Sequence, residues 1–150
     1  MKKVLFLLLC TVLTGCSFHT ISDVSQQTID VHVRASDWQY TNMIDNNYFR
    51  CVIDMPEITS QVFNQGEVQV YRVFNRNTAD AFKHVLPDVF HQKSVIDGET
   101  FLYTTTVDCF YGIGWLEFNY RVSDFVYDNG NYGDFAPEGM DFSIVITKSY

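Results

Sequence analysis

The densest collection of side chains that could do chemistry lies between residues 128 and 141, in the segment DNGNYGDFAPEGMD. Carboxylate and amide oxygens on a glycine-rich loop are the ligands that Ca²⁺ prefers in proteins. The spacing departs from the EF-hand pattern, because Gly130 stands where an oxygen ligand is expected. We therefore interpret the segment as a solvated surface loop, and we expect no metal site and no cofactor. The oxygen-bearing side chains concerned are Asp128, Asn131, Asp134, Glu138 and Asp141.

Three histidines, His32, His84 and His91, could supply a general base or a metal ligand. None stands beside a serine or cysteine in a recognisable nucleophile motif, and the sequence contains no GxSxG, HExxH or P-loop signature. Carboxylate pairs that hydrolyse glycosides are defined by their separation in space, so the sequence singles out none. The pattern favours surface histidines and a protein that is not an enzyme.

Aromatic residues make up 16% of the chain, and this abundance raises the question of an aromatic binding face. Exposed rings beside carboxylates and amides can stack on sugar rings or hold a protein partner. Strands also favour Tyr, Phe and Trp for packing alone, so abundance by itself identifies no site. If the protein binds a small ligand, we expect the site beside the long loop, at Tyr111, Tyr132 and Phe135.

The first sixteen residues carry the clearest motif of the chain. Two lysines precede an apolar run at residues 4–12, and Leu13-Thr14-Gly15-Cys16 follows it. A positive start, an apolar stretch and small residues at the cleavage point are typical of an export signal. The run of about nine residues is too short to cross a bilayer, which takes roughly 20. The pattern resembles a bacterial lipoprotein signal peptide with its lipobox, which implies cleavage before Cys16 and attachment of lipid to that cysteine.

Removal of this leader would leave one domain, long enough to bury a substantial core. We expect residues 1–15 to be the signal peptide, residues 16–26 the lipidated cysteine with a polar tether, and residues 27–150 the folded domain. The full sequence has a net charge of −8, and the two lysines of the leader would be lost on cleavage. So acidic a domain is not expected to bind nucleic acid, whose phosphates attract basic surfaces.

Two cysteines, Cys51 and Cys109, remain in the expected mature domain. Export would place them in a compartment that permits disulfides. Both occupy the apolar-facing positions of predicted strands, which would let them meet across a sandwich. The sequence leaves open a disulfide between them and a pair of buried thiols.

Period-two alternation of apolar and polar residues predicts at least six strands. In residues 28–35, for example, Ile29, Val31 and Val33 share one face, as in a half-buried strand. A brief helical segment is expected from Ile58 to Asn64, and residues 79–90 are ambiguous because Pro87 breaks any long helix. Short strands without long helices between them predict an all-β fold, an antiparallel β-sandwich (Ig-like or related) of about seven strands with one short helix. The other predicted strands cover residues 48–55, 67–74, 100–110, 115–122 and 142–148.

Several short sequence segments, spread over most of the expected mature chain, resemble segments of other proteins. They are Asp37-Trp38, residues 48–55, Pro56-Glu57-Ile58-Thr59, Gly66-Glu67-Val68-Gln69-Val70-Tyr71, Leu86-Pro87, Ser123-Asp124 and residues 142–146. Together they resemble a recurring group of small, uncharacterised lipoproteins from Bacteroidota. The resemblance implies a β-rich, lipid-anchored domain and transfers no catalytic residue. Surface-exported lipoproteins of that phylum are typically acidic just after the lipid cysteine, whereas Ser17-Phe18-His19 follows here, which favours an anchor in the outer membrane facing the periplasm.

These observations predict a lipid-anchored cell-envelope lipoprotein with a non-enzymatic structural or protein-interaction role. Lipid on Cys16 would hold it to the membrane, and the expected partner is an envelope protein. The alternative is a glycan or small-ligand binding module on the outer membrane.

Overall fold

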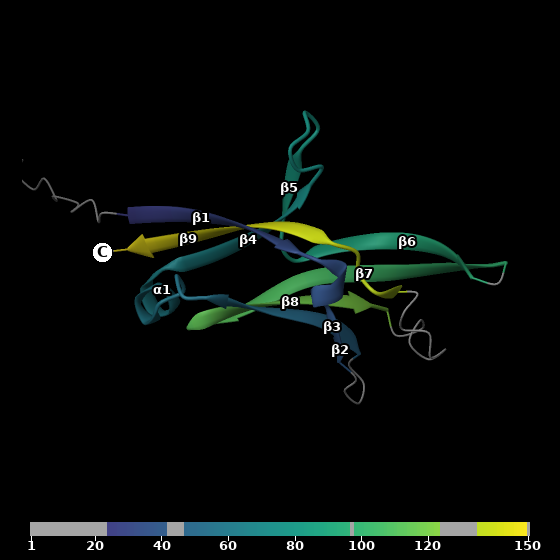
Figure 1. The fold of residues 1–150 in the computed structure, drawn as a ribbon, viewed down its shortest axis with the longest axis horizontal. Coiled ribbons are helices and arrows are strands. Elements are labelled where there is room, and N and C mark those ends of the chain that lie inside the picture. Colours follow the sequence, from purple (N-terminus) through teal and green to yellow (C-terminus); the bar gives the residue numbers. More distant parts are fainter. Residues whose placement is uncertain (1–23, 42–46, 97, 124–134, 150) are drawn as a thin grey trace, which may run out of the picture.

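The computed structural model describes residues 24–41, 47–96, 98–123 and 135–149, and it confirms an all-β sandwich. Nine strands and one short α-helix lie in these ranges, and the strands form two antiparallel sheets (Figure 1). The first sheet has the order β1-β9-β4-β5: Val24–Val33, Met140–Ser149, Glu67–Phe74 and Phe82–Val85. The second has the order β2-β3-β8-β7-β6: Gln39–Thr41, Tyr48–Met55, Gly114–Val122, Glu99–Gly112 and Asp88–Ile96.

Alternation along the strands builds the core between the two sheets. Phe118 of β8 and Phe142 of β9 stack with ring centroids 3.9 Å apart, and both side chains are 0% exposed. Ile144 and Ile146 continue the buried row of β9, and Leu116 continues that of β8. Removal of so much apolar surface from water is the main force that holds the sheets face to face.

A short helix, α1 (Ser60–Gln65), closes one end of the sandwich. The hydroxyl of Thr59 accepts a hydrogen bond from the Val62 backbone amide, which satisfies a free N–H of the first turn. Val62 and the preceding Ile58 are buried. Gly66 ends the helix where a Cβ would lie 2.3 Å from the carbonyl oxygen of Thr147, so only glycine allows β9 to approach this closely.

The first strand differs from its expected limits at both ends. It begins at Val24, inside the segment expected to be tether, and ends at Val33, before the expected end at Ala35. The cause of the early end is local. Asp37 accepts hydrogen bonds from the backbone and the guanidinium of Arg34, and this pair folds Ala35–Asp37 into a 3₁₀ turn.

Candidate functional site

The candidate site begins with an interruption in the alternation of β4. Val68 and Val70 face the core, and Arg72 occupies the next inward position, opposite Phe142 in the register. Its guanidinium lies 4.5 Å from the ring centroid of Phe74 and 4.8 Å from that of Phe90. The two rings meet edge to face, with centroids 6.1 Å apart, and a cation packed against both gains electrostatic attraction while it loses water.

The carboxylate of Asp88 lies near Arg72, but the Arg72 guanidinium donates no hydrogen bond to it. The closest approach to Asp88 is 4.0 Å, between Nη1 and Oδ2, which is an ion pair and too long for a hydrogen bond. Asp88 is itself buried, and its Oδ1 lies 3.2 Å from Nδ1 of His84. Burial lowers the pKa of Arg72, with the attraction of Asp88 acting against it. An arginine carries five N–H donors, and within the described residues Arg72 donates none of them in a side-chain hydrogen bond.

These donors face a cavity of about 340 Å³, which we call the Arg72 pocket. It lies where the inward faces of the two sheets meet the segment that leads into β9. Its volume falls at the lower end of the range for small-ligand sites. The pocket is lined by Arg72, Gln92, Tyr103, Tyr120, Phe135, Ala136, Pro137, Glu138 and Met140.

The walls of the pocket combine aromatic surface with fixed polar groups. Tyr103 and Phe135 meet edge to face, with centroids 5.4 Å apart. The Tyr103 hydroxyl donates to Oε1 of Gln92 at 2.8 Å, which orients both side chains. Burial raises the pKa of Tyr120 to about 12, so its phenol is neutral over the physiological range. Glu138 is exposed at the pocket and supplies a carboxylate acceptor.

This arrangement is suited to recognition of a small polar ring. Arg72 can donate to oxygen atoms of a ligand, Glu138 can accept from its hydroxyl groups, and the faces of Tyr103 and Phe135 offer apolar contact. The charges of Arg72, Asp88 and Glu138 sum to a small negative value, which favours a ligand without a strong negative charge.

The structure separates the three residues expected to bind a ligand. Phe135 is buried and lines the Arg72 pocket. Tyr111 lies at the other end of β7, where its ring meets Phe63 of α1 with centroids 6.2 Å apart. Tyr111 and Phe135 therefore cannot contact one small ligand together. Tyr132, like Cys16, lies outside the described residues.

Cys51 and Cys109 are free thiols, of which Cys51 is buried and Cys109 half-buried. Both face the core, as their parity predicted, but they belong to one sheet and do not meet across the sandwich. Each pairs with Phe118, on opposite sides of β8. Two steps between neighbouring strands separate their Cα atoms by about 10 Å, beyond the roughly 7 Å that a disulfide can span.

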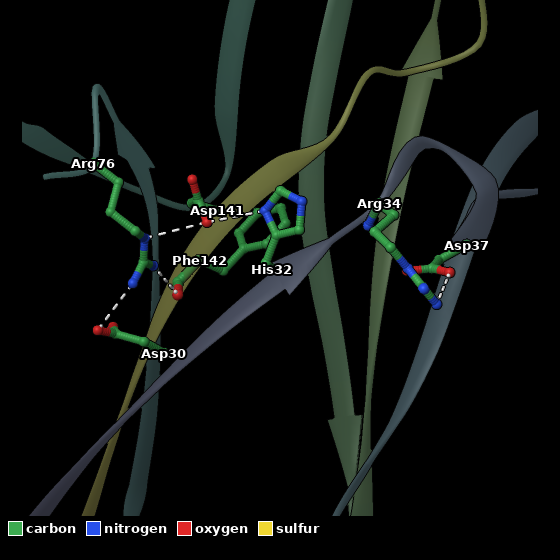
Figure 2. Close-up of polar contacts among 7 residues, drawn as sticks. All are labelled: Asp30, His32, Arg34, Asp37, Arg76, Asp141 and Phe142. Carbon is green, nitrogen blue, oxygen red and sulfur yellow. Dashed lines mark hydrogen bonds and ion pairs between the residues drawn. The ribbon is translucent and has the colours of Figure 1, made fainter.

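A polar network covers the outer face of the first sheet (Figure 2). Arg76, from the turn after β4, contacts Asp30 Oδ2 at 3.0 Å and Asp141 Oδ1 at 3.2 Å. The same guanidinium donates to the Phe142 carbonyl at 3.0 Å, and Nδ1 of His32 lies 3.1 Å from Asp141. The network fastens the β4–β5 turn to the neighbouring strands β1 and β9.

The other candidate catalytic groups also have structural partners. Lys83 donates to the Ser143 hydroxyl at 2.9 Å, but Ser143 is fully buried and out of reach of a substrate. His91 lies 3.2 Å from the Thr104 hydroxyl. Of the oxygen-bearing side chains of the loop, Asp141 belongs to β9 and contacts Arg76 and His32, whereas Asp128, Asn131 and Asp134 lie outside the described residues.

The residues that build the pocket were not singled out by sequence reasoning, although a signal was present. Arg72 stands at an inward position directly after Val68 and Val70, where alternation requires an apolar side chain. Asp88 and Gln92 do the same on β6. Polar side chains at the inward positions of a strand, where apolar ones are expected, indicate that a polar site replaces the core at that place.

Comparisons of the chain with protein-family models, curated proteins and solved structures find no match. Among the described residues, no helix has the length and apolar character needed to span a membrane.

Proposed function

We propose that this protein is a lipid-anchored lipoprotein of the cell envelope, held in the outer membrane and facing the periplasm, that acts by binding and not by catalysis. We further propose that it binds a sugar unit of a glycan, or a small polar molecule of similar shape, in the Arg72 pocket. The observation that carries this proposal is a largely buried guanidinium with unused donors, which packs against Phe74 and Phe90 and lines a pocket that also has aromatic walls.

The chemistry of the pocket supports a sugar more than an apolar ligand. A sugar ring has hydroxyl groups that both donate and accept, which matches Arg72 as donor and Glu138 as acceptor. Its C–H faces can lie against Tyr103 and Phe135. An apolar molecule would bury the Arg72 donors without partners, which is costly.

Binding is tested by NMR or calorimetric titration of the folded protein with galactose, N-acetylglucosamine and glucuronic acid, and then with their oligomers. We expect at least one to perturb the signals of Tyr103 and Gln92. Arg72→Gln should remove this binding, whereas Arg50→Gln, on the outer face of the second sheet, should leave it unchanged. A folded protein that binds none of these sugars would contradict the ligand proposal.

The anchor is tested separately by Cys16→Ser. This substitution removes the thiol that would carry the lipid, so the protein should leave the membrane fraction and lose the mass of the acyl chains. Continued sedimentation with membranes, or an intact mass without lipid in the unsubstituted protein, would contradict the lipoprotein proposal.

A protein-interaction role is the second candidate, and strand β5 favours it. All four residues of β5 are exposed, the strand forms one edge of its sheet, and it projects from the sandwich (Figure 1). An exposed edge can accept a strand from another protein. Cross-linking in native membranes should then capture one stoichiometric partner, and Val85→Pro, which blocks the edge, should abolish the capture. Capture that is unaffected by Val85→Pro would count against this edge.

A further inference from the structure

We infer that four exposed apolar side chains at one end of the sandwich form a contact with the membrane interface. This membrane tip consists of Phe63, Tyr111, Ile113 and Trp115. The inference rests on the proposed lipid anchor at Cys16, and it adds a second point of attachment that would orient the domain.

The tip is built by α1 and by the turn between β7 and β8. Ile113 stands at the apex of that turn and is 56% exposed, and Phe63 lies on the helix beside Tyr111. The Gly114 amide donates to the Ile58 carbonyl at 2.9 Å, which fastens the turn to the segment before the helix. The rings are therefore held in place by backbone hydrogen bonds and do not depend on a partner for their position.

The start of the first strand lies at the same end of the molecule. Figure 1 shows the beginning of β1, the end of β9, α1 and the β7–β8 turn together on the left. The register agrees, because Gln26 of β1 pairs with Thr147, and Thr147 in turn adjoins Gly66 at the end of α1. A lipid attached near the start of β1 would bring this end toward the bilayer.

The length of chain between the anchor and the sandwich limits how far the tip can be from the membrane. Seven residues, 17–23, separate Cys16 from Val24. The eight steps from Cys16 to Val24 span at most about 29 Å when the chain is fully extended. The anchor would thus keep the tip close to the lipid surface at all times, whereas contact with a protein partner would require that partner to diffuse to the tip.

The composition of the tip agrees with an interfacial position. Trp and Tyr are the residues enriched at the boundary between headgroups and acyl chains, since their rings are apolar with one polar end. Ile113, the most exposed of the four side chains, would add an apolar group at the turn. The domain is acidic overall, so a shallow apolar contact is more favourable than electrostatic attraction to anionic lipid.

The orientation has a consequence for the Arg72 pocket. Tyr103 of the pocket lies eight residues before Tyr111 of the tip on the same strand, a separation of about 26 Å. With the tip on the membrane, the pocket is therefore held away from the lipid surface and open to the periplasm.

The test uses the full-length, lipidated protein reconstituted into phosphatidylcholine vesicles that contain brominated lipid. The chain has two tryptophans, and Trp38 is buried, so quenching by shallow bromine should report on Trp115. We expect quenching in the unsubstituted protein and its loss in Ile113→Asp. The matched control is Leu102→Asp, because Leu102 is 74% exposed and lies near the opposite end of β7; it should be quenched like the unsubstituted protein.

A second measurement does not depend on these substitutions. A photoreactive amino acid at position 113 should form adducts with lipid in native membranes, and one at position 102 should not. Adducts of position 113 with a protein in place of lipid would overturn the inference. So would vesicle-bound protein without quenching, and so would equal quenching in both aspartate variants.

The mass of the purified protein, which shows whether it carries lipid, distinguishes an error in the proposed anchor from an error in the proposed membrane tip. A protein that carries no lipid and does not remain with the vesicles overturns the proposed anchor, and the inference falls with it. A protein that carries lipid but leaves Trp115 unquenched overturns the inference alone.

Discussion

Two arginines on the outer surface form ion pairs with aspartates, one with a near neighbour in the sequence and the other with distant residues. Arg34 pairs with Asp37 within one turn, whereas Arg76 joins Asp30 of β1 to Asp141 of β9 (Figure 2). The pKa of Asp30 is lowered first by its hydrogen bond with Ser143 and then by the attraction of Arg76. The pKa of Asp37 is lowered by the hydrogen bonds from Arg34.

Removing each arginine should therefore raise the pKa of its own aspartate. We expect Arg76→Ala to raise the pKa of Asp30 and to leave that of Asp37 unchanged, and Arg34→Ala to do the reverse. Carbon-detected NMR titration of the carboxyl groups measures both values. Because the folded pKa is lowered, Asp30 stabilises the fold above about pH 3.8, and this contribution is lost as the pH falls through its folded pKa. Arg76→Ala variants whose Asp30 titrates as before would contradict the role given to Arg76.

The two core thiols should be almost inert in the folded protein. Burial raises the pKa of Cys109 to about 11, with Asp108 adding to the effect, and burial also raises the pKa of Cys51. The thiolate is the reactive form, so alkylation at neutral pH should be slow until the protein is unfolded. Peptide mass spectrometry after alkylation in denaturant should then find both cysteines modified without prior reduction. A requirement for reductant would show that the thiols are joined.

At the scale of elements, the stacked rings of Phe118 and Phe142 join β8 of the second sheet to β9 of the first. Phe118→Ala should lower the free energy of unfolding by about 3–5 kcal/mol, since it removes a fully buried ring and leaves a cavity in its place. Phe110→Ala, on the exposed outer face of β7, should change it by about 0.5 kcal/mol or less. Urea unfolding of the two variants measures the difference. Similar losses for both would mean that Phe118 does not hold the sheets together.

Strands with regular alternation could be predicted from the sequence, and strands without it could not. The expected strands at 48–55 and 67–74 coincide with β3 and β4, because their apolar residues follow a period of two. β5 and β6 were missed because Pro87 separates them and because Asp88 and Gln92 stand on the inward face of β6. The polar residues on the inward face of β6 made this strand hard to recognise in the sequence, and one of them, Gln92, lines the Arg72 pocket.

The pairing of strands could not be predicted from the sequence, for a different reason. Parity placed Cys51 and Cys109 correctly on the core side, but parity does not say which sheet a strand joins. That choice depends on contacts between distant segments, here the pairing of β3 and β7 with the two sides of β8. Residue 135 could be linked with ligand binding from its loop, whereas its neighbours Arg72 and Tyr103 come from strands 63 and 32 residues away.

At the scale of the whole molecule, the two proposed contacts lie apart along the strands. The turn between β7 and β8 and α1, which build the membrane tip, lie at the end of the sandwich where β1 begins (Figure 1). Gln92 of β6 and Tyr103 of β7, which line the Arg72 pocket, lie further along these strands from that end. In the proposed arrangement, seven residues, 17–23, would join the lipid on Cys16 to the start of β1, which would limit how far the sandwich could move from the membrane. Together, the two proposals describe a protein that would present a binding site at a limited distance from a membrane.

The core between the sheets also predicts how the whole molecule responds to alkali. Burial raises the pKa of Tyr120 to about 12 and that of Cys109 to about 11, from ordinary values of 10.0 and 9.0. A raised folded pKa means that each neutral group stabilises the fold below its ordinary pKa, and that this contribution is lost as the pH rises through the folded value. The midpoint of urea unfolding should therefore fall steadily from about pH 9 to pH 12.

Two variants separate the groups that cause this loss. Cys109→Ala should remove the part that begins near pH 9, and Tyr120→Phe should remove the part that begins near pH 10, because each substitution leaves nothing to ionise at that position. Tyr71→Phe is the matched control, since Tyr71 lies on the outer face of β4 and donates to Gln69 there. A fall in the unfolding midpoint that persists unchanged in both core variants would show that neither Cys109 nor Tyr120 causes the alkaline response.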